Sequence, residues 1–453
     1  MFKSLLSRCC LSSFILFNAS VHATEAHPST SNKTVVDNVE LKVGVANPVM
    51  LANKTQQKVY LKTALIGAPL SQNQDRSPVN IALVLDKSGS MSGDRMIAAK
   101  QASIIAINHL QAEDIVSVVR YDTRVKVIIP ATKVSNKQAI TQKINRLSAG
   151  GSTALYAGVE QGALEVEKFM DDNHINRVIL LSDGKANVGL KSVSALAKLG
   201  ERLGGKGISV TTIGLGSSYN EDLMSQLASY SDGNHAYAKH TSDLDKIFNL
   251  EFGDVTAVIA KNIQINIHCA TDVKPLQVMG REDTVQGQNI HVRLNQLVAG
   301  QEKFILTELE VPISEAGSQR VLVNITVDYF DLQQQKNIQK TAQQTVTFTD
   351  SKQVVLEATD NEVMGVAVEQ IANKMSKEAV KLRDEGEVQA AKGLLDRTAN
   401  YLRGFASSYE SETLKQQAEQ AQDDADNMGE SDWNVQRKSL REQQHKKDRQ
   451  QTY

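Results

Sequence analysis

Five oxygen-bearing side chains form the main chemical pattern in this sequence. They are Asp86, Ser88, Ser90, Thr153 and Asp183. The first three share an Asp-x-Ser-x-Ser run that directly follows the strand-like segment 79–85, and the last comes soon after the apolar segment 177–181. Carboxylate and hydroxyl oxygens suit a hard cation such as Mg²⁺, which prefers near-octahedral oxygen coordination at about 2.0–2.1 Å. The residue types therefore indicate oxygen ligands for a divalent cation.

The segments that carry these residues have the pattern of a buried parallel sheet. The run 79–85 is almost entirely apolar, which is typical of a strand covered on both faces. In a doubly wound sheet, ligands bind where strands end and loops diverge, and Asp86 lies at such an end. Gly89 allows the tight loop that follows to turn its two hydroxyls toward the same point.

Strands and helices alternate from residue 78 to residue 253. This alternation predicts an α/β fold with a doubly wound, mostly parallel, Rossmann-like sheet. We expect strands at 79–85, 115–121, 125–129, 177–181, 208–213 and 235–238, and helices at 94–110, 136–147, 153–169, 193–203, 221–228 and 244–252. The span fits one domain of ordinary size.

Three segments of this region resemble motifs of the von Willebrand factor A (VWA) family. They are Asp-Lys-Ser-Gly-Ser at 86–90, Gly-Gly-Ser-Thr-Ala-Leu at 150–155 and Leu-Leu-Ser-Asp-Gly at 180–184. The resemblance extends over residues 79–253 and is specific, because five positions match on the expected elements, whereas a lone Asp-x-Ser-x-Ser run is a weak signal. It implies a metal-ion-dependent adhesion site (MIDAS).

The resemblance also implies a role for each residue of that site. Ser88, Ser90 and Thr153 would bind the metal directly, and Asp86 and Asp183 would act directly or through water. Because the three inner ligands are neutral, the cation would keep much of its charge and offer one position to an outside carboxylate. The implied cofactor is Mg²⁺, with Mn²⁺ or Ca²⁺ as alternatives, and the implied partner is a protein that presents Asp or Glu. The competing interpretation is a metal that only stabilises its loops.

The α/β region is flanked by segments with other patterns. Residues 34–70 and 255–350 contain period-two runs, which predict an antiparallel β-sandwich into which the VWA domain, 78–253, is inserted. Residues 361–406 predict a helical hairpin, and residues 407–453 a polar tail that is disordered or a frayed helix. The predicted molecule is thus a VWA domain inserted in or flanked by a β-sandwich, with a C-terminal helical region.

Residues 1–23 have the layout of a secretory signal peptide. Lys3 and Arg8 give a positive start, an apolar stretch covers 10–17, and small or permissive residues precede a cut near Ala23. The apolar stretch is shorter than the roughly 20 residues that span a bilayer, and we expect no transmembrane segment in the mature chain. We therefore expect a periplasmic or secreted protein.

Composition narrows the classes of partner and cofactor. The formal net charge of the 453 residues is -2, which argues against a nucleic-acid-binding protein. Two of the three cysteines fall in the predicted signal peptide, and Cys269 is expected to be a small buried side chain. The histidines are scattered without zinc-ligand spacing. The glycine-rich run at 200–207 lacks the Ser or Thr that a P-loop needs.

Three functions from different classes compete. The favoured one is a cation-dependent protein-binding module of the cell envelope, of the cell-adhesion type. The second is an envelope assembly factor that holds an acidic segment of a client and uses the C-terminal helices as a second contact. The third is a metal-assisted hydrolase, which needs a base beside the open metal position. The sequence identifies no such base, so we expect the protein not to be an enzyme.

Overall fold

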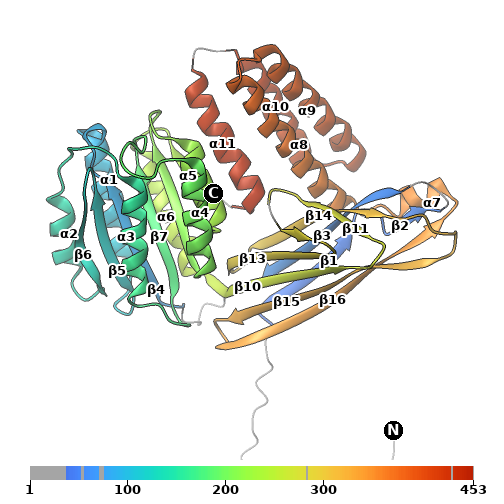
Figure 1. Cartoon of the computed structure of the whole chain (residues 1–453), viewed down its shortest axis with the longest axis horizontal. Helices are drawn as coiled ribbons and strands as arrows, with labels where there is room; N and C mark the ends of the chain where they lie inside the picture. Colours follow the sequence, from blue (N-terminus) through green and yellow to red (C-terminus); the bar gives the residue numbers. More distant parts are fainter. Residues whose placement is uncertain (1–36, 53–55, 71–75, 282–283, 430–431, 452–453) are drawn as a thin grey trace, which may run out of the picture. The chain divides into compact units, whose positions relative to one another are not determined.

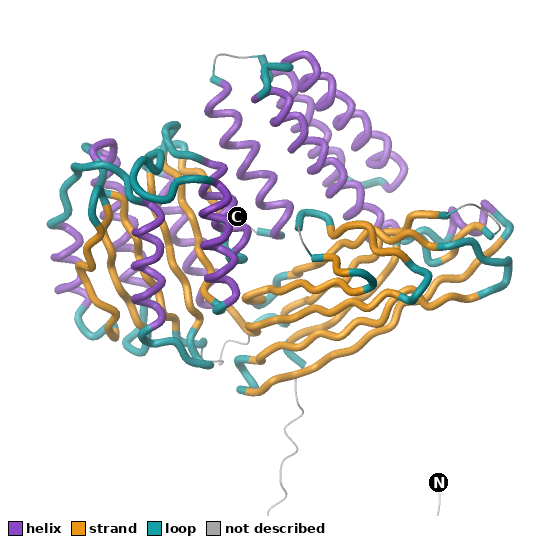
Figure 2. The backbone as a smooth tube through the Cα atoms, in the orientation of Figure 1, coloured by secondary structure: helices purple, strands orange, loops and turns teal. Residues whose placement is uncertain are grey.

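The computed structural model describes most of the chain (Figure 1). The described residues are 37–52, 56–70, 76–281, 284–429 and 432–451. Asn38–Tyr453 form one compact unit that contains three sheets and a group of C-terminal helices (Figure 2). The predicted signal peptide and its cut near Ala23 lie outside the described residues.

A six-stranded sheet forms the middle of the α/β region. In spatial order its strands are β6 (Val125–Lys133), β5 (Ile115–Tyr121), β4 (Val79–Asp86), β7 (Ile175–Ser182), β8 (Ile208–Leu215) and β9 (His235–Ala238). Only the pairing of β5 with β6 is antiparallel within this sheet. Every residue of β4, β7 and β8 is buried, which explains their largely apolar sequences. The predicted doubly wound, mostly parallel sheet is confirmed.

Helices cover both faces of this sheet (Figure 1). They are η1 (Gly89–Met91), α1 (Asp94–His109), α2 (Lys137–Asn145), α3 (Leu155–Glu167), α4 (Val193–Gly205), α5 (Glu221–Tyr230) and α6 (Asp243–Thr256). The helices α1, α2 and α6 share one apolar core with the sheet, and α3, α4 and α5 share another. Asn136, Ser192 and Asn220 cap the first turns of α2, α4 and α5 with side-chain oxygens. The packed helices hold the loops at the strand ends in place.

The remaining strands form two sheets with a common core. One sheet has the order β1 (Val39–Val45), β3 (Gln57–Gly67), β14 (Glu302–Val311) and β11 (Lys274–Val278). The other has the order β12 (Val285–Gln286), β13 (Asn289–Val298), β10 (Val258–Cys269), β15 (Gln319–Asp331), β16 (Lys336–Thr349) and β2 (Val49–Leu51). Apolar side chains of both sheets pack into one cluster, as in a sandwich.

Strands that precede and follow the α/β region in the sequence lie side by side in this sandwich. The strand β3 pairs along its length with β14, from Gln57 opposite Val311 to Ile66 opposite Glu302. The polypeptide therefore leaves the sandwich before the α/β region and returns to it afterwards. Cys269, at the end of β10, is buried as predicted, and burial raises the pKa of its thiol to about 11.

Five helices follow the sandwich. They are α7 (Lys352–Glu357), α8 (Asn361–Asp384), α9 (Val388–Tyr409), α10 (Glu412–Asn427) and α11 (Trp433–Arg449). The first turn of α8 is tied to the sheet, because Glu362 accepts from Lys42 over 2.7 Å and from Lys62 over 2.9 Å. These two hydrogen-bonded ion pairs lower the pKa of Glu362 to about 2.

The prediction of a disordered or frayed tail at 407–453 is wrong for the described residues. The helix α10 buries a stripe at helical spacing: Leu414, Ala418, Ala421 and Ala425. The helix α11 buries mainly polar and charged side chains: Lys438, Leu440, Gln444, His445 and Arg449. Both helices pack although most of their residues are polar, because α10 buries small alanines and α11 buries polar and charged side chains. The polar composition therefore led to the wrong prediction.

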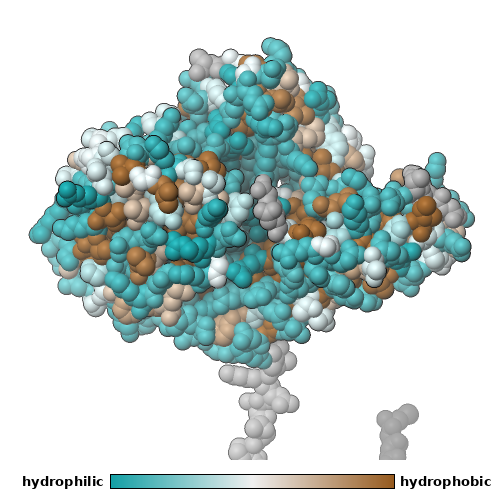
Figure 3. All heavy atoms as spheres, in the orientation of Figure 1, coloured by the Kyte–Doolittle hydropathy of each residue, from teal (hydrophilic) through white to brown (hydrophobic). Residues whose placement is uncertain are grey.

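The described surface is mainly hydrophilic. In the view of Figure 3, polar side chains cover most of the visible face and apolar side chains lie in scattered patches. Large exposed apolar side chains such as Leu190, Ile313 and Leu356 lie in separate segments of the chain. In the described part of the chain, no helix has the length and apolarity needed to cross a membrane.

Candidate metal centre

The five predicted residues come together at the carboxyl edge of the central sheet. Asp86 is the last residue of β4, and Asp183 directly follows β7. Because β4 and β7 are parallel neighbours, their carboxyl ends lie side by side. Ser88 follows β4, Ser90 lies in the short helix η1, and Thr153 lies on the loop before α3. This is the edge at which doubly wound sheets bind ligands.

Hydrogen bonds connect the loop residues to both carboxylates. The backbone N–H of Ser88 donates to Asp86 Oδ1 over 2.8 Å. The hydroxyl oxygens of Ser88 and Ser90 lie 3.1 Å apart, and Ser90 Oγ donates to Asp183 Oδ1 over 2.8 Å. On the other side, Ser182 Oγ donates to Asp86 Oδ2 over 2.6 Å. The hydroxyls and carboxylates therefore form one preorganised set.

The position of Gly184 shows that oxygens from two other segments of the chain converge on it. A Cβ atom built on Gly184 would lie 3.3 Å from Thr153 Oγ1 and 3.5 Å from Ser90 Oγ. The same atom would lie 3.7 Å from Asp86 Oδ2. The described residues include no group of three or more His, Cys, Asp or Glu side chains that could hold a metal. A cation here would thus depend on hydroxyl ligands together with two carboxylates, a donor set that fits Mg²⁺.

The burial and proximity of the Asp86 and Asp183 carboxylates favour a cation at this site. The side chains of Asp86 and Asp183 are fully buried, whereas Ser90 is exposed. Burial raises the pKa of Asp86, hydrogen bonds from Ser182 and Ser88 oppose this rise, and the carboxylate of Asp183 adds to it. Because neighbouring buried carboxylates repel each other, a cation between them would relieve the repulsion.

Arg95 also belongs to this site, although its sequence context carries no metal-ligand pattern. Its Nη1 donates to Asp183 Oδ2 over 2.5 Å and to the backbone oxygen of Ser90 over 3.2 Å. The side chain is 34% exposed, while that of Asp183 is inaccessible. Arg95 therefore supplies positive charge from the solvent side. Its place in the first turn of α1, directly after the loop, is the only sequence signal for this contact.

The two hydroxyl-bearing loops are joined to each other. The Gly89 N–H donates to the Gly151 oxygen over 2.9 Å, and the Gly150 N–H donates to the Lys87 oxygen over 2.6 Å. Lys87 Nζ also lies 2.7 Å from the Asp122 carboxylate. Gly151 has a φ of 93°, and a Cβ there would lie 2.9 Å from Asp122 Cβ. Glycine is therefore needed at that position.

A hollow of about 820 Å³ opens beside the converging oxygens. We name it the ligand hollow. Ser90, Thr153 and Gly184 lie on its wall, together with Trp433 and Arg437 of α11 and residues from the end of α8. The C-terminal helices therefore form part of the surface that a ligand of the candidate metal centre would meet.

Three carboxylates line the ligand hollow, and cations of α11 pair with all of them. Arg437 Nη2 lies 2.7 Å from Asp222 Oδ2 and 2.8 Å from Asp384 Oδ2. Arg437 also pairs with Glu221, whose other oxygen lies 2.8 Å from Lys438 Nζ. Although burial raises the pKa of Glu221, its partners Lys438 and Arg437 lower it overall. These carboxylates hold α11 against α5.

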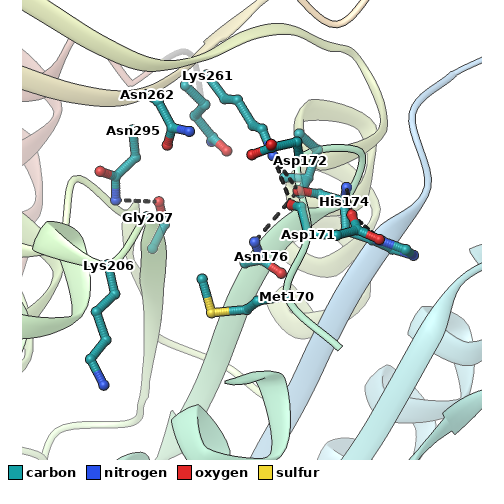
Figure 4. Close-up of a pocket in the computed structure, with 13 residues that line it drawn as sticks. Met170, Asp171, Asp172, His174, Asn176, Lys206, Gly207, Lys261, Asn262 and Asn295 are labelled. Carbon is teal, nitrogen blue, oxygen red and sulfur yellow. Dashed lines mark hydrogen bonds and ion pairs between the residues drawn. The ribbon is translucent and has the colours of Figure 1, made fainter. Parts of the chain in front are cut away.

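Figure 4 shows a separate cavity of about 260 Å³ at the amino ends of β7 and β8. One charged group on its wall, Lys261, is already engaged, because its Nζ donates to the backbone oxygens of Asp171 and His174 over 3.0 and 3.3 Å. Asn295 Nδ2 donates to Ser209 Oγ over 3.1 Å. These bonds connect the sandwich to the α/β region at the edge opposite to the candidate metal centre.

Comparisons with known proteins agree with this fold. A family model described as the von Willebrand factor type A domain matches residues 80–250. "Uncharacterized protein sll0103" of Synechocystis sp. is 31% identical over 288 residues, which cover 58% of this chain and 68% of that protein. "Uncharacterized protein YfbK" of Escherichia coli is 27% identical over 261 residues, which cover 56% of this chain and 45% of that protein. The chain thus spans less than half of the second relative.

Among solved structures, the fold is similar to that of a von Willebrand factor type A protein from Catenulispora acidiphila. The TM-score is 0.68, and the match covers 85% of this chain and 90% of the other. The sequences are 14% identical, so the likeness concerns the fold alone. Because the match is much longer than residues 80–250, it includes elements outside the α/β region.

Proposed function

Because this chain belongs to the von Willebrand factor type A domain family, we propose that it is a divalent-cation-dependent protein-binding module. The observation that carries the proposal is the convergence of three oxygens, those of Thr153, Ser90 and Asp86, from two separate segments on Gly184 of the third. In the proposed MIDAS, Ser88, Ser90 and Thr153 hold the cation, and Asp86 and Asp183 bind it directly or through water.

The surroundings of the site favour an acidic ligand. A bound Mg²⁺ would supply a positive charge with a coordination position open to a carboxylate, and Mn²⁺ or Ca²⁺ could take its place. Ser182 holds Asp86 in position, while Arg95 holds Asp183 and adds a second positive charge. The proposed ligand is therefore an Asp or Glu side chain of a partner protein.

We propose binding rather than catalysis. A metal-assisted hydrolase needs a general base beside the open position. Among the described residues, the carboxylates that line the ligand hollow are Glu221, Asp222 and Asp384, and all three are held by Arg437 or Lys438. These ion pairs occupy the carboxylate oxygens that a general base would use.

We also propose a periplasmic or secreted location. This proposal depends on the sequence of residues 1–23, with the cut near Ala23. Mass spectrometry of the protein from its native host tests it. A mature chain that begins near Thr24 in the periplasmic or extracellular fraction would support the location, whereas an intact N-terminus would contradict it.

Calorimetry tests the binding proposal on the full chain. Mg²⁺ and Mn²⁺ are titrated into the wild type and into Asp86→Asn, with and without a peptide that contains a single Glu. We expect the wild type to bind metal at one site and the peptide only when metal is present. The isosteric change removes one charge from the site, so metal affinity should fall by roughly tenfold or more, equal to about 1.4 kcal/mol.

The exposed Asp172 provides the matched control, because it lies at the opposite edge of the sheet. Asp172→Asn should bind metal like the wild type. Unchanged metal affinity in Asp86→Asn, or peptide binding without metal, would contradict the proposed mechanism. Circular dichroism of both variants checks that the fold is retained.

A second candidate function is an envelope assembly factor that uses the C-terminal helices as well as the metal. The specific observation in its favour is that α11 lines the ligand hollow next to Ser90 and Thr153. Asn434 is exposed on that wall. Asn434→Asp should weaken peptide binding by charge repulsion without altering metal affinity, and the exposed Asn400→Asp of α9 should change neither. Equal peptide affinities in the two variants would exclude α11 as a contact.

A further inference from the structure

A second hollow, of about 420 Å³, lies on other elements than the candidate metal centre. We name it the basic hollow, because five basic residues line it: Arg281, Arg293, Lys374, Lys377 and Arg449. Arg281 follows β11 of the sandwich, and Arg449 is the last residue of α11. None of the five proposed metal ligands contributes to its wall.

Two of these arginines are buried and have N–H groups without a hydrogen-bond acceptor among the described residues. The side chain of Arg281 is 10% exposed, and Arg449 is 9% exposed. Within the described part of the chain, Arg281 Nη2 and the Nε and Nη1 atoms of Arg449 are buried and have no hydrogen-bond partner. A buried charged donor without an acceptor costs several times what a neutral one costs, so such groups are normally paired.

The carboxylates that line the basic hollow do not accept hydrogen bonds from these arginine donors. Asp232 Oδ1 lies 3.8 Å from Arg281 Nη2, which is too long for a hydrogen bond. The other oxygen of Asp232 accepts from the Asn295 N–H over 2.7 Å. Asp448 accepts from Asn373 over 2.8 Å and pairs with Lys377. Asp448 is therefore committed to other donors, and Asp232 gives Arg281 a long ion pair but no hydrogen bond, so its Oδ1 is also buried without a hydrogen-bond partner in the described structure.

The charges around the two arginines are also unbalanced. Among the described residues, the wall carries five basic side chains against three acidic ones, Glu201, Asp232 and Asp448. Burial, followed by the positive charge of Arg449, lowers the pKa of Arg281 to about 9. The two guanidinium groups thus repel each other across a space that is open to a negatively charged group.

We propose that the basic hollow binds an oxyanion of the phosphate or sulfate class, free or carried on a small organic molecule. Arg281 and Arg449 donate to it directly, because a planar guanidinium matches tetrahedral oxyanions with two parallel N–H groups. The volume exceeds that of a single ion and lies in the range of small-molecule sites. An anion held by both arginines would join the sandwich to the end of α11.

Calorimetry and thermal unfolding of the full chain test this proposal. The probes are sodium phosphate, sodium sulfate and glucose 6-phosphate, each compared with sodium chloride at equal ionic strength. We expect one bound oxyanion per chain and a higher melting temperature than in chloride. Tighter binding of glucose 6-phosphate than of inorganic phosphate would identify an organic ester as the natural class, and equal binding would identify the free ion.

Substitution of each buried arginine separates a ligand site from a structural one. Arg281→Gln and Arg449→Gln should each lose roughly tenfold or more in oxyanion affinity, because a hydrogen bond to a charged group contributes about 1.5–3 kcal/mol. In buffer without the anion, neither variant should melt below the wild type, since each relieves repulsion between cations. The exposed Arg202→Gln, which loses only its pair with Glu160, should bind the anion normally.

The wild-type titration alone can overturn the proposal. No uptake of any of the three oxyanions beyond the effect of chloride would do so, whatever the variants show. Retained oxyanion binding in both arginine variants would also contradict it. So would a lower melting temperature of these variants in anion-free buffer, because the arginines would then be structural groups satisfied by the protein itself.

Discussion

At the scale of single residues, the absence of a side chain at Gly184 leaves space for a cation beside the converging oxygens. A methyl group there would lie 3.3–3.7 Å from the oxygens of Thr153, Ser90 and Asp86. These contacts are near van der Waals distance, so the fold should accept Gly184→Ala. The methyl group would nevertheless occupy space at the point of convergence, and we expect metal affinity to fall by roughly tenfold or more by calorimetry.

A matched glycine substitution gives the control. Gly365, within α8, has open space at its Cβ position. Gly365→Ala should therefore bind metal like the wild type. Equal metal affinities in the two alanine variants would show that the oxygens around Gly184 do not hold the cation.

At the scale of elements, α11 carries a buried histidine that meets another on β9. The rings of His235 and His445 lie 5.8 Å apart. His445 Nδ1 lies 3.0 Å from Ser229 Oγ, and its Nε2 lies 3.2 Å from the Gly233 oxygen. Burial lowers the pKa of His235 to about 4, and burial together with His235 lowers the pKa of His445 well below its usual value. Both rings are therefore neutral in the folded protein at neutral pH.

This pair makes the fold sensitive to acid. In the unfolded chain both histidines take up protons near their ordinary pKa of about 6.5, whereas His235 in the folded chain does so only near 4. Between these values the unfolded state binds more protons, so the free energy of unfolding should fall as the pH falls. Denaturant melts from pH 7 to pH 4 measure this slope. The charged groups that act on the pair are Glu221, Lys377, Lys446 and Arg449.

Replacement of one histidine should flatten the slope. His445→Gln removes one of the two shifted groups, and it also relieves His235 of a buried neighbour. The exposed His268→Gln should keep the wild-type dependence. A slope that does not change in His445→Gln would show that the acid sensitivity has another origin.

Elements with a strong apolar pattern could be predicted from the sequence. Contacts between residues that only the tertiary fold brings together could not. The strands β4 and β7 were predictable because burial on both faces requires continuous apolar runs. The packing of α10 was not, because its buried stripe consists largely of alanine within a Gln- and Asp-rich segment. The five oxygen-bearing residues of the candidate metal centre could be inferred from local motifs, whereas Arg95 and Arg437 reach the site only through tertiary contacts.

At the scale of the whole molecule, the sandwich is built from segments on both sides of the α/β region. The backbone pairing of β3 with β14 should hold the N-terminal strands in place even if the covalent connection is cut. A protease site introduced between residues 70 and 76 tests this. After cleavage we expect the two fragments to elute together in gel filtration and to separate only in denaturant.

The uncut protein with the same insertion is the control for this experiment. Release of the fragment that contains β1 and β3 in native buffer would contradict the shared sandwich. It would also indicate that the apolar core common to both sheets contributes less to stability than its burial suggests.

The single tryptophan of the chain lies at the start of α11, on the wall of the ligand hollow. Its Nε1 donates to Asp384 Oδ1 over 3.1 Å, and the guanidinium of Arg383 lies 5.2 Å from the ring centroid. Indole fluorescence responds to nearby charge and water. The unlabelled protein therefore contains its own optical probe, and a shift in Trp433 emission on addition of a ligand would report occupancy of the hollow without an attached dye.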